Sequence, residues 1–167
     1  AQSALPGQFV IVRVDEQGER IPLTIADFDP ADGTVTIVIQ TIGVSTRKMC
    51  ALGEGDCLAD FAGPLGNPSE FVKMSSEELR DRRYLFVAGG VGTAPVYPQV
   101  KWLHEHGVAA DVIIGAKTES MLIYTDEMAA VADNLYIATD DGSCGFKGMV
   151  TGKIKELIET EGKHYDE

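Results

Sequence analysis

The feature that most constrains the fold is an alternation of apolar runs and helical segments in the second half of the chain. A continuous apolar run at 84–90 is typical of a strand buried on both faces, and we expect a second buried strand at 110–116 and a third strand at 134–141. A helix is expected after each run, at 95–106, from Asp126 and Glu127 onward, and at 151–159 with Ile154, Leu157 and Ile158 on its inner face. Successive strand–helix units predict a parallel sheet with right-handed crossovers.

The first half carries strand and turn signals instead. Runs rich in β-branched and aromatic residues, separated by Gly, Pro and Asp, predict short strands at 9–14, 21–27, 34–42 and 56–63. Pro22 limits its strand to an edge or irregular position, and Ser45 is expected to cap a short helix. Short antiparallel strands at this spacing are typical of a small barrel or sandwich, but these are too few to close one.

Two domains follow from this change of pattern. We predict an incomplete β-barrel over 1–73 and an α/β parallel-sheet domain over 74–167. A polar connector holds one helical turn, capped by Ser75 or Ser76. Both ends look cut, because the chain starts at Ala1 without an initiator Met and stops after a helix, where a strand is expected next.

Composition excludes several classes of function. The 167 residues carry a net charge of −12, which gives little attraction for nucleic acid or anionic lipid. No apolar run is long enough to span a bilayer, and no signal peptide is visible. Cys50, Cys57 and Cys144 lack metal-ligand spacing, which favours a reducing, cytoplasmic setting. We expect Cys50 and Cys57 to serve as small apolar filler.

The sharpest chemical signal is the run GGVGTAP at 89–95, between a predicted strand and a predicted helix. Gly90 and Gly92 allow a tight turn and close approach of a ligand, and the helix start offers free N–H groups to a phosphate. Pro95 replaces the last glycine of the usual dinucleotide motif. The second strand ends in GAKTES, with Lys117 and no acid for a ribose. A standard Rossmann dehydrogenase is therefore disfavoured.

Four motifs together resemble the ferredoxin–NADP reductase superfamily. They are RIPLT at 20–24, GVST at 43–46, GPLG at 63–66 and G-x-G-x-x-P within 90–95. The resemblance is closest to two groups of electron-transfer subunits. One is the small subunit of NADH-dependent ferredoxin–NADP oxidoreductase, or sulfide dehydrogenase, and the other is the dihydroorotate dehydrogenase electron-transfer subunit.

This resemblance implies an NAD(P)H-dependent flavin oxidoreductase. It places FAD in the first domain, with the Arg20 guanidinium on the pyrophosphate and the Thr24 hydroxyl near flavin N5, where hydride arrives. The implied FAD contacts are Arg20, Pro22, Leu23, Thr24, Ile39, Gln40, Thr41, Gly43, Ser45 and Thr46. The implied NAD(H) or NADP(H) contacts are Gly90, Gly92, Thr93, Pro95, Lys117, Asp140, Asp141, Gly142 and Ser143. Electrons would pass on to a [2Fe–2S] cluster and then to a larger partner subunit or ferredoxin.

Several departures leave alternatives open. The family's first barrel strands, its last nicotinamide-domain strand and its four-cysteine cluster segment are absent, and Cys144 does not match a cluster ligand by position. A non-catalytic nucleotide-binding or regulatory module of the same fold is the alternative function. The segment from Asp140 to Ser143 is equally well explained as a surface turn, and Lys117 alone does not decide between NADH and NADPH.

Overall fold

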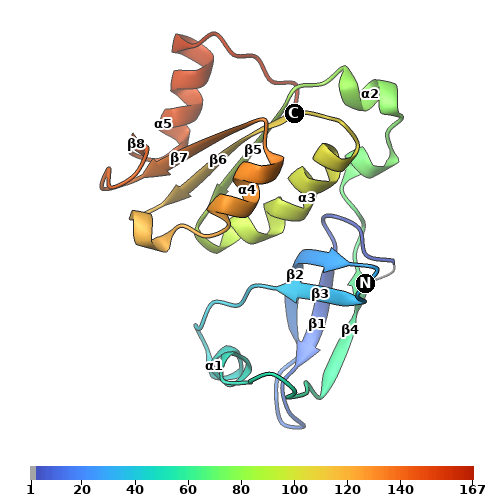
Figure 1. Cartoon of the computed structure of the whole chain (residues 1–167). Helices are drawn as coiled ribbons and strands as arrows, with labels where there is room; N and C mark the ends of the chain where they lie inside the picture. The colour runs from blue at the N-terminus through green and yellow to red at the C-terminus, as the bar shows by residue number, and fades with distance from the viewer. Residues whose placement is uncertain (1–2) are drawn as a thin grey trace. The chain divides into compact units, whose positions relative to one another are not determined.

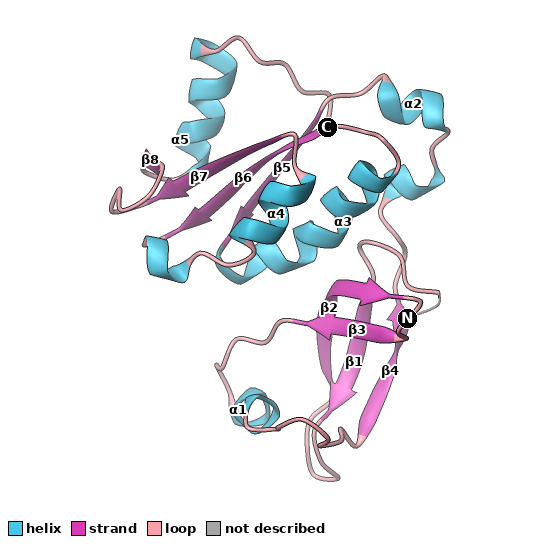
Figure 2. Cartoon of the chain, viewed as in Figure 1, coloured by secondary structure: helices cyan, strands magenta, loops and turns pink. Residues whose placement is uncertain are grey.

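The computed structural model describes residues 3–167, so the expectation attached to Ala1 lies outside the described residues. These residues form two compact units, with the boundary between Val72 and Lys73. Figures 1 and 2 show that the first unit consists mostly of strands and that the second alternates strands with helices. The predicted fold class, an incomplete antiparallel barrel followed by a parallel α/β domain, is confirmed.

The first unit is an open antiparallel sheet in the order β3-β2-β1-β4. Its strands are β1 (Phe9–Arg13), β2 (Ile21–Asp29), β3 (Thr34–Ile37) and β4 (Asp60–Leu65). Because side chains alternate along a strand, Val10 and Val12 turn inward. They pack in a core that includes Ile25 and Met49. Apolar burial on this one face holds the sheet together.

Pro22 occupies a position that suits its missing N–H. It pairs with Ile11 of β1, whereas β3 pairs only with the part of β2 from Ile25 onward. The other side of β2 at Pro22 therefore needs no ladder donor, as the sequence predicted. The fourth strand was predicted over 56–63, but β4 begins at Asp60 and continues through Pro64 to Leu65.

Two predictions about the segment after β2 are wrong. The strand predicted over 34–42 ends at Ile37, and the chain is irregular from 38 to 43. Helix α1 (Val44–Cys50) is capped at Gly43 rather than at Ser45. The hydroxyl of Thr46 accepts hydrogen bonds from the N–H groups of Gly43 and Ile42, at 2.9 and 3.1 Å. This side chain closes the loop and fixes the helix start two residues earlier.

The connector is capped by Ser75, which decides between the two serines. A short 3₁₀ turn (Glu70–Lys73) precedes helix α2 (Ser76–Arg80). Ser75 Oγ accepts from the N–H of Glu78 at 3.3 Å, and the Glu78 carboxylate accepts from the N–H of Ser75 at 2.9 Å. This reciprocal pair satisfies two N–H groups that the helix itself leaves free.

The second unit is a parallel sheet in the order β5-β6-β7-β8. Its strands are β5 (Tyr84–Gly89), β6 (Ala110–Ala116), β7 (Asn134–Thr139) and β8 (Phe146–Lys147). The central strand β6 is buried as predicted, but β5 lies at an edge of the described sheet and Val87 is 37% exposed. Strand β8 was not predicted, because its two residues lie within a glycine-rich loop.

Three main helices cover this sheet. Helices α3 (Thr93–Glu105) and α4 (Thr125–Val131) lie side by side against one face, and α5 (Val150–Lys155) lies against the other (Figure 1). Helix α3 begins two residues before Pro95. A π-helical turn (Glu156–Thr160) continues α5 and changes its register, so Leu157 is buried while Ile158 is 49% exposed. The predicted inward position of Ile158 is therefore wrong.

The side chains of Cys50 and Cys57 are exposed, so the prediction that they fill the core is wrong. Among residues 3–167, no cluster of three or more His, Cys, Asp or Glu side chains is arranged to hold a metal ion. Across the same residues, every helix is too short or too polar to cross a membrane.

Candidate functional site

The outward face of β2 presents the residues expected to contact FAD. Pro22 and Thr24 are both exposed, and alternation along the strand puts them on the same side. They lie opposite Ile11 and Phe9 of β1, whose side chains are half-buried. Leu23 points the other way and packs against the core. The result is a partly apolar surface edged by a threonine hydroxyl, which suits a flat ligand.

Arg20 adds positive charge beside this face. Its Nη2 donates to Asp60 Oδ2 at 2.9 Å, and Nε of Arg13 donates to the same oxygen at 2.7 Å. One carboxylate thus serves two guanidinium groups, and Arg13 also pairs with Glu16 at 3.6 Å. The Arg20 side chain is 64% exposed, so its remaining N–H groups are available to an anion.

Only some residues of the segment 39–46, which is also expected to contact FAD, are accessible to a ligand. Ile39 packs against the core, whereas Gln40 and Thr41 are exposed beyond the end of β3. A Cβ atom at Gly43 would meet no other atom within 4 Å, so this backbone is open to a ligand. The Thr46 hydroxyl is committed to its own loop, which leaves Ser45 as the better donor.

The glycine-rich loop has the open backbone that the sequence predicted. Strand β5 ends at Gly89, and a 3₁₀ turn (Gly90–Gly92) leads into α3. Gly90 has φ +54°, and added Cβ atoms at Gly90 or Gly92 would meet nothing within 4 Å. This empty side is where a ligand can approach the main chain.

The residues behind the loop are tightly packed. Thr93 is fully buried, and within the described chain its hydroxyl has no hydrogen-bond partner. Pro95 is the third residue of α3, where the helix leaves N–H groups free anyway. The loop is therefore backed by a buried helix start that contains one hydroxyl without a hydrogen-bond partner.

A cavity of about 380 Å³ lies at the carboxyl ends of the parallel strands. Gly89 at the end of β5, Gly90 in the turn that follows, Gly115 from β6 and Ala138 from β7 give it a floor of small residues. This is the end of an open parallel sheet where ligands generally bind. Of the predicted nucleotide contacts, Gly90, Lys117 and Asp140 line it.

Two methionines on the rim were missed by sequence reasoning. Met121 and Met149 are 51% and 70% exposed, and both line the cavity. Neither belongs to a recognisable motif. The sequence signal that could have found them is their position, because each methionine follows the end of a strand by a few residues.

In the loop from Asp140 to Ser143, one residue is placed to contact a nucleotide and the others form a surface turn. Asp140 lines the cavity, but Asp141 accepts hydrogen bonds from the Ser143 N–H and hydroxyl at 3.0 and 2.6 Å. These bonds hold the pKa of Asp141 below its ordinary value. Ser143 Oγ also accepts from the N–H of Glu119 at 2.8 Å, and Gly142 has φ +78°. Asp141, Gly142 and Ser143 thus shape the loop, and Asp140 alone faces the cavity.

Known proteins resemble the chain across both units. A curated protein of Clostridium beijerinckii, "Uncharacterized protein in adh 3'region", is 58% identical over 99% of this chain and 56% of its own length. A Thermotoga maritima protein named "Dihydroorotate dehydrogenase B (NAD(+)), electron transfer subunit homolog" is 43% identical over 95% of this chain and 53% of its own. No protein-family model matches.

A solved structure also superposes on the chain. It comes from work on "flavin-based electron bifurcation via the NADH-dependent reduced ferredoxin-NADP oxidoreductase structure". It has a TM-score of 0.83 and 41% identity, and the match covers 95% of this chain and 55% of that one. The resemblance to the ferredoxin–NADP reductase superfamily and its electron-transfer subunits is therefore confirmed. The chain spans little more than half the length of the curated relatives it matches.

Proposed function

We propose that this chain is the flavin- and nicotinamide-binding part of an electron-transfer subunit. It takes reducing equivalents from NADH or NADPH through FAD and passes them toward an iron–sulfur cluster and a larger partner subunit or ferredoxin. The observation that carries the proposal is the pair of surfaces on separate units. Arg20 and Thr24 flank one, and Gly90 opens the other.

The first unit fits FAD in charge and in exposure. The free N–H groups of Arg20 would neutralise a pyrophosphate, and the apolar outward face of β2 would support a planar ring. Thr24 would offer its hydroxyl at the ring. Gln40, Thr41 and Ser45 are exposed or uncommitted and complete the expected set, with Gly43 providing open backbone. Bound FAD would supply the conversion between two-electron and one-electron transfer.

The second unit fits a nicotinamide nucleotide at the carboxyl ends of its strands. Gly90 and Gly92 leave space where Cβ atoms would otherwise stand, and the start of α3 offers N–H groups to a phosphate. Lys117 would contribute positive charge at the rim of the cavity. The protein needs no acid–base pair for this reaction, because its residues bind and orient while the cofactors carry the chemistry.

The residues described here do not hold the iron–sulfur cluster. Cys50 and Cys57 are exposed in the first unit, and Cys144 belongs to the second. Within residues 3–167 no four-thiolate site is present, so the proposal assigns the cluster to the part of its relatives that this chain does not span.

Flavin absorbance tests the proposal. The purified protein, supplied with FAD and freed of excess by gel filtration, should be yellow and should bleach when NADH or NADPH is added without oxygen. A colourless protein that binds nicotinamide nucleotide but never FAD would contradict the proposal. That result would favour the non-catalytic nucleotide-binding module instead.

A further inference from the structure

Met121 and Met149 expose large apolar side chains at the rim of the cavity beside Gly90. They are 51% and 70% exposed, whereas Met49 and Met128 are buried in the cores of their units. A single exposed apolar residue is ordinary on a protein surface, but two of them on one cavity favour a ligand with an apolar face.

Hydrogen bonds hold the backbone at both methionines. Met121 ends a 3₁₀ turn (Glu119–Met121), and its N–H donates to the Thr118 carbonyl at 3.1 Å. Met149 is the N-terminal cap of α5, and its carbonyl accepts from the N–H of Gly152 at 2.9 Å. The main chain is therefore fixed, while each side chain keeps three rotatable bonds with which to fit a ligand.

The rest of the cavity suits a flat, uncharged ring. An added Cβ atom at Gly89 would meet only the Gly115 carbonyl oxygen, at 3.8 Å, so the floor of small residues is open there. Among the described residues that line the cavity, only Lys117 and Asp140 are charged. Thioether sulfur makes favourable contacts with aromatic rings, so the two methionines complete a site for such a ring.

The glycine-rich loop decides which ring reaches the cavity. Gly89 and Gly90 belong to both the loop and the cavity lining, so a pyrophosphate at the loop brings one of its two nucleosides into the cavity. In the proposed reaction the nicotinamide must contact flavin bound by the first unit, whereas residues of the second unit alone line the cavity. The base left for the cavity is the adenine.

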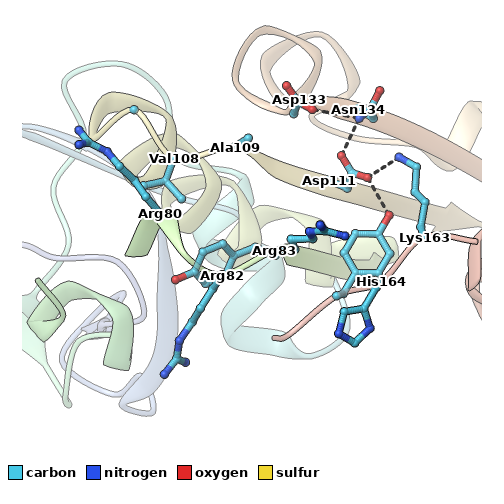
Figure 3. A pocket seen from close by; sticks show the side chains of 13 residues that line it. Arg80, Arg82, Arg83, Val108, Ala109, Asp111, Asp133, Asn134, Lys163 and His164 are labelled. Atoms are coloured by element: carbon cyan, nitrogen blue, oxygen red, sulfur yellow. Dashed lines mark hydrogen bonds and ion pairs between the residues drawn. The ribbon is translucent and has the colours of Figure 1, made fainter. Parts of the chain in front are cut away.

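A larger cavity of the second unit, about 520 Å³, is not part of this site. It lies around Asp111 at the amino ends of the strands, and the described residues that line it include none from 89–93. Lys163 and Tyr165, from the C-terminal segment 161–167, and Asn134 each donate to the Asp111 carboxylate at 2.7 Å (Figure 3). The protein's own side chains thus already engage the central carboxylate of that cavity.

We propose that Met121 and Met149 bind the adenine ring of NADH or NADPH, an inference that rests on the proposed function. Apolar burial and sulfur–aromatic contact supply the attraction. The two residues bind and orient the end of the dinucleotide that does not react, which leaves the nicotinamide ring free for the flavin. They determine specificity for the base and take no part in the transfer itself.

Isothermal titration of the purified chain tests this assignment with two probes. One is NADH or NADPH, whichever binds the wild type more tightly, and the other is ADP, which carries adenine and pyrophosphate but no nicotinamide. Met121→Ala and Met149→Ala should each raise both Kd values by the same factor, roughly three- to tenfold. Because both side chains are exposed, neither variant should lower the thermal unfolding temperature.

Ile158→Ala is the matched control, because Ile158 is 49% exposed in the same unit and does not line the cavity. It should bind both probes as the wild type does. The assignment is overturned if ADP does not bind the wild type at millimolar concentration, or if the methionine variants lose affinity for the dinucleotide but not for ADP. It is also overturned if Ile158→Ala weakens binding as much as they do.

The same titrations separate this inference from the proposed function. If a dinucleotide binds the wild type and both methionine variants equally, only the methionine assignment fails. If neither NADH nor NADPH binds the wild type, the proposed function fails, and this inference fails with it.

Discussion

Arg20 is the residue on which the flavin assignment depends most. Arg20→Ala should raise the Kd for FAD about tenfold or more, because a charge-assisted hydrogen bond contributes about 1.5–3 kcal/mol. Asp60 keeps Arg13 as its partner, so folding should be little affected. FAD titration followed by flavin fluorescence measures the effect. Lys48→Ala, which also removes one exposed cation from the first unit, is the control. Equal affinity in both variants would remove Arg20 from the site.

Asp111 makes the docking of the C-terminal segment sensitive to acid. Burial alone would raise its pKa, but hydrogen bonds from Lys163, Asn134 and Tyr165 hold the pKa below its ordinary value. A carboxyl whose folded pKa is lowered stabilises the fold above its unfolded pKa, about 3.9, and loses that contribution as the pH falls through the folded value.

We therefore expect the segment to stay docked at neutral pH and to loosen below about pH 4. Amide exchange by NMR at Lys163 and Asp166 reports this, because their N–H groups bond to Leu157 and Arg83. Asp111→Asn should show fast exchange already at neutral pH. Unchanged protection in acid, or in the variant, would contradict the proposed role of Asp111.

Among the elements, the clearest test concerns the cap of α2. Ser75→Ala removes the acceptor for the Glu78 N–H and should cost about 0.5–2 kcal/mol of stability. Ser76→Ala changes the same residue type inside the helix and should change stability by less than about 0.5 kcal/mol. Urea unfolding compares the two. A larger loss for Ser76→Ala would mean that the cap has been assigned to the wrong serine.

The elements also show how far sequence patterns reach. The buried strand β6 was predictable from its continuous apolar run, and the glycine-rich loop from its position between strand and helix. The start of α1 was not, because the Thr46 hydroxyl, three residues into the segment, closes the loop and sets the cap. The exposure of Ile158 was missed because a π turn cannot be recognised from helical spacing.

In the second unit, contacts between residues far apart in the chain could not be predicted from the sequence. Asp111 and Lys163 are 52 positions apart, and nothing in their local sequence marks them as partners. The same holds for Met121 and Met149, which meet at one cavity although they come from different loops. The glycine positions were predictable because backbone freedom is a local property, whereas cavities depend on packing across the sheet.

At the scale of the whole molecule, the two units should differ in how well each supports its ligand. In residues 3–72 the sheet of the first unit has free edges at β3 and β4, whereas the second unit buries every residue of its inner strand β6 except Ala116. We predict that the chain retains FAD at less than one equivalent after gel filtration, while the second unit stays folded. Amide exchange should be slower in β6 than in β1. Stoichiometric FAD with equal protection in both units would show that the open sheet is sufficient.

The central claim is that nicotinamide nucleotide binds at the glycine-rich loop and reduces flavin held elsewhere on the chain. The most direct measurement is the bleaching of flavin absorbance by NADH, without oxygen and with FAD in excess of its Kd, in wild type and Gly92→Val. A Val side chain would fill the open space beside the loop, so the variant should bind FAD normally, bleach with dithionite and fail to bleach with NADH. Bleaching of Gly92→Val by NADH at the wild-type rate would contradict the account.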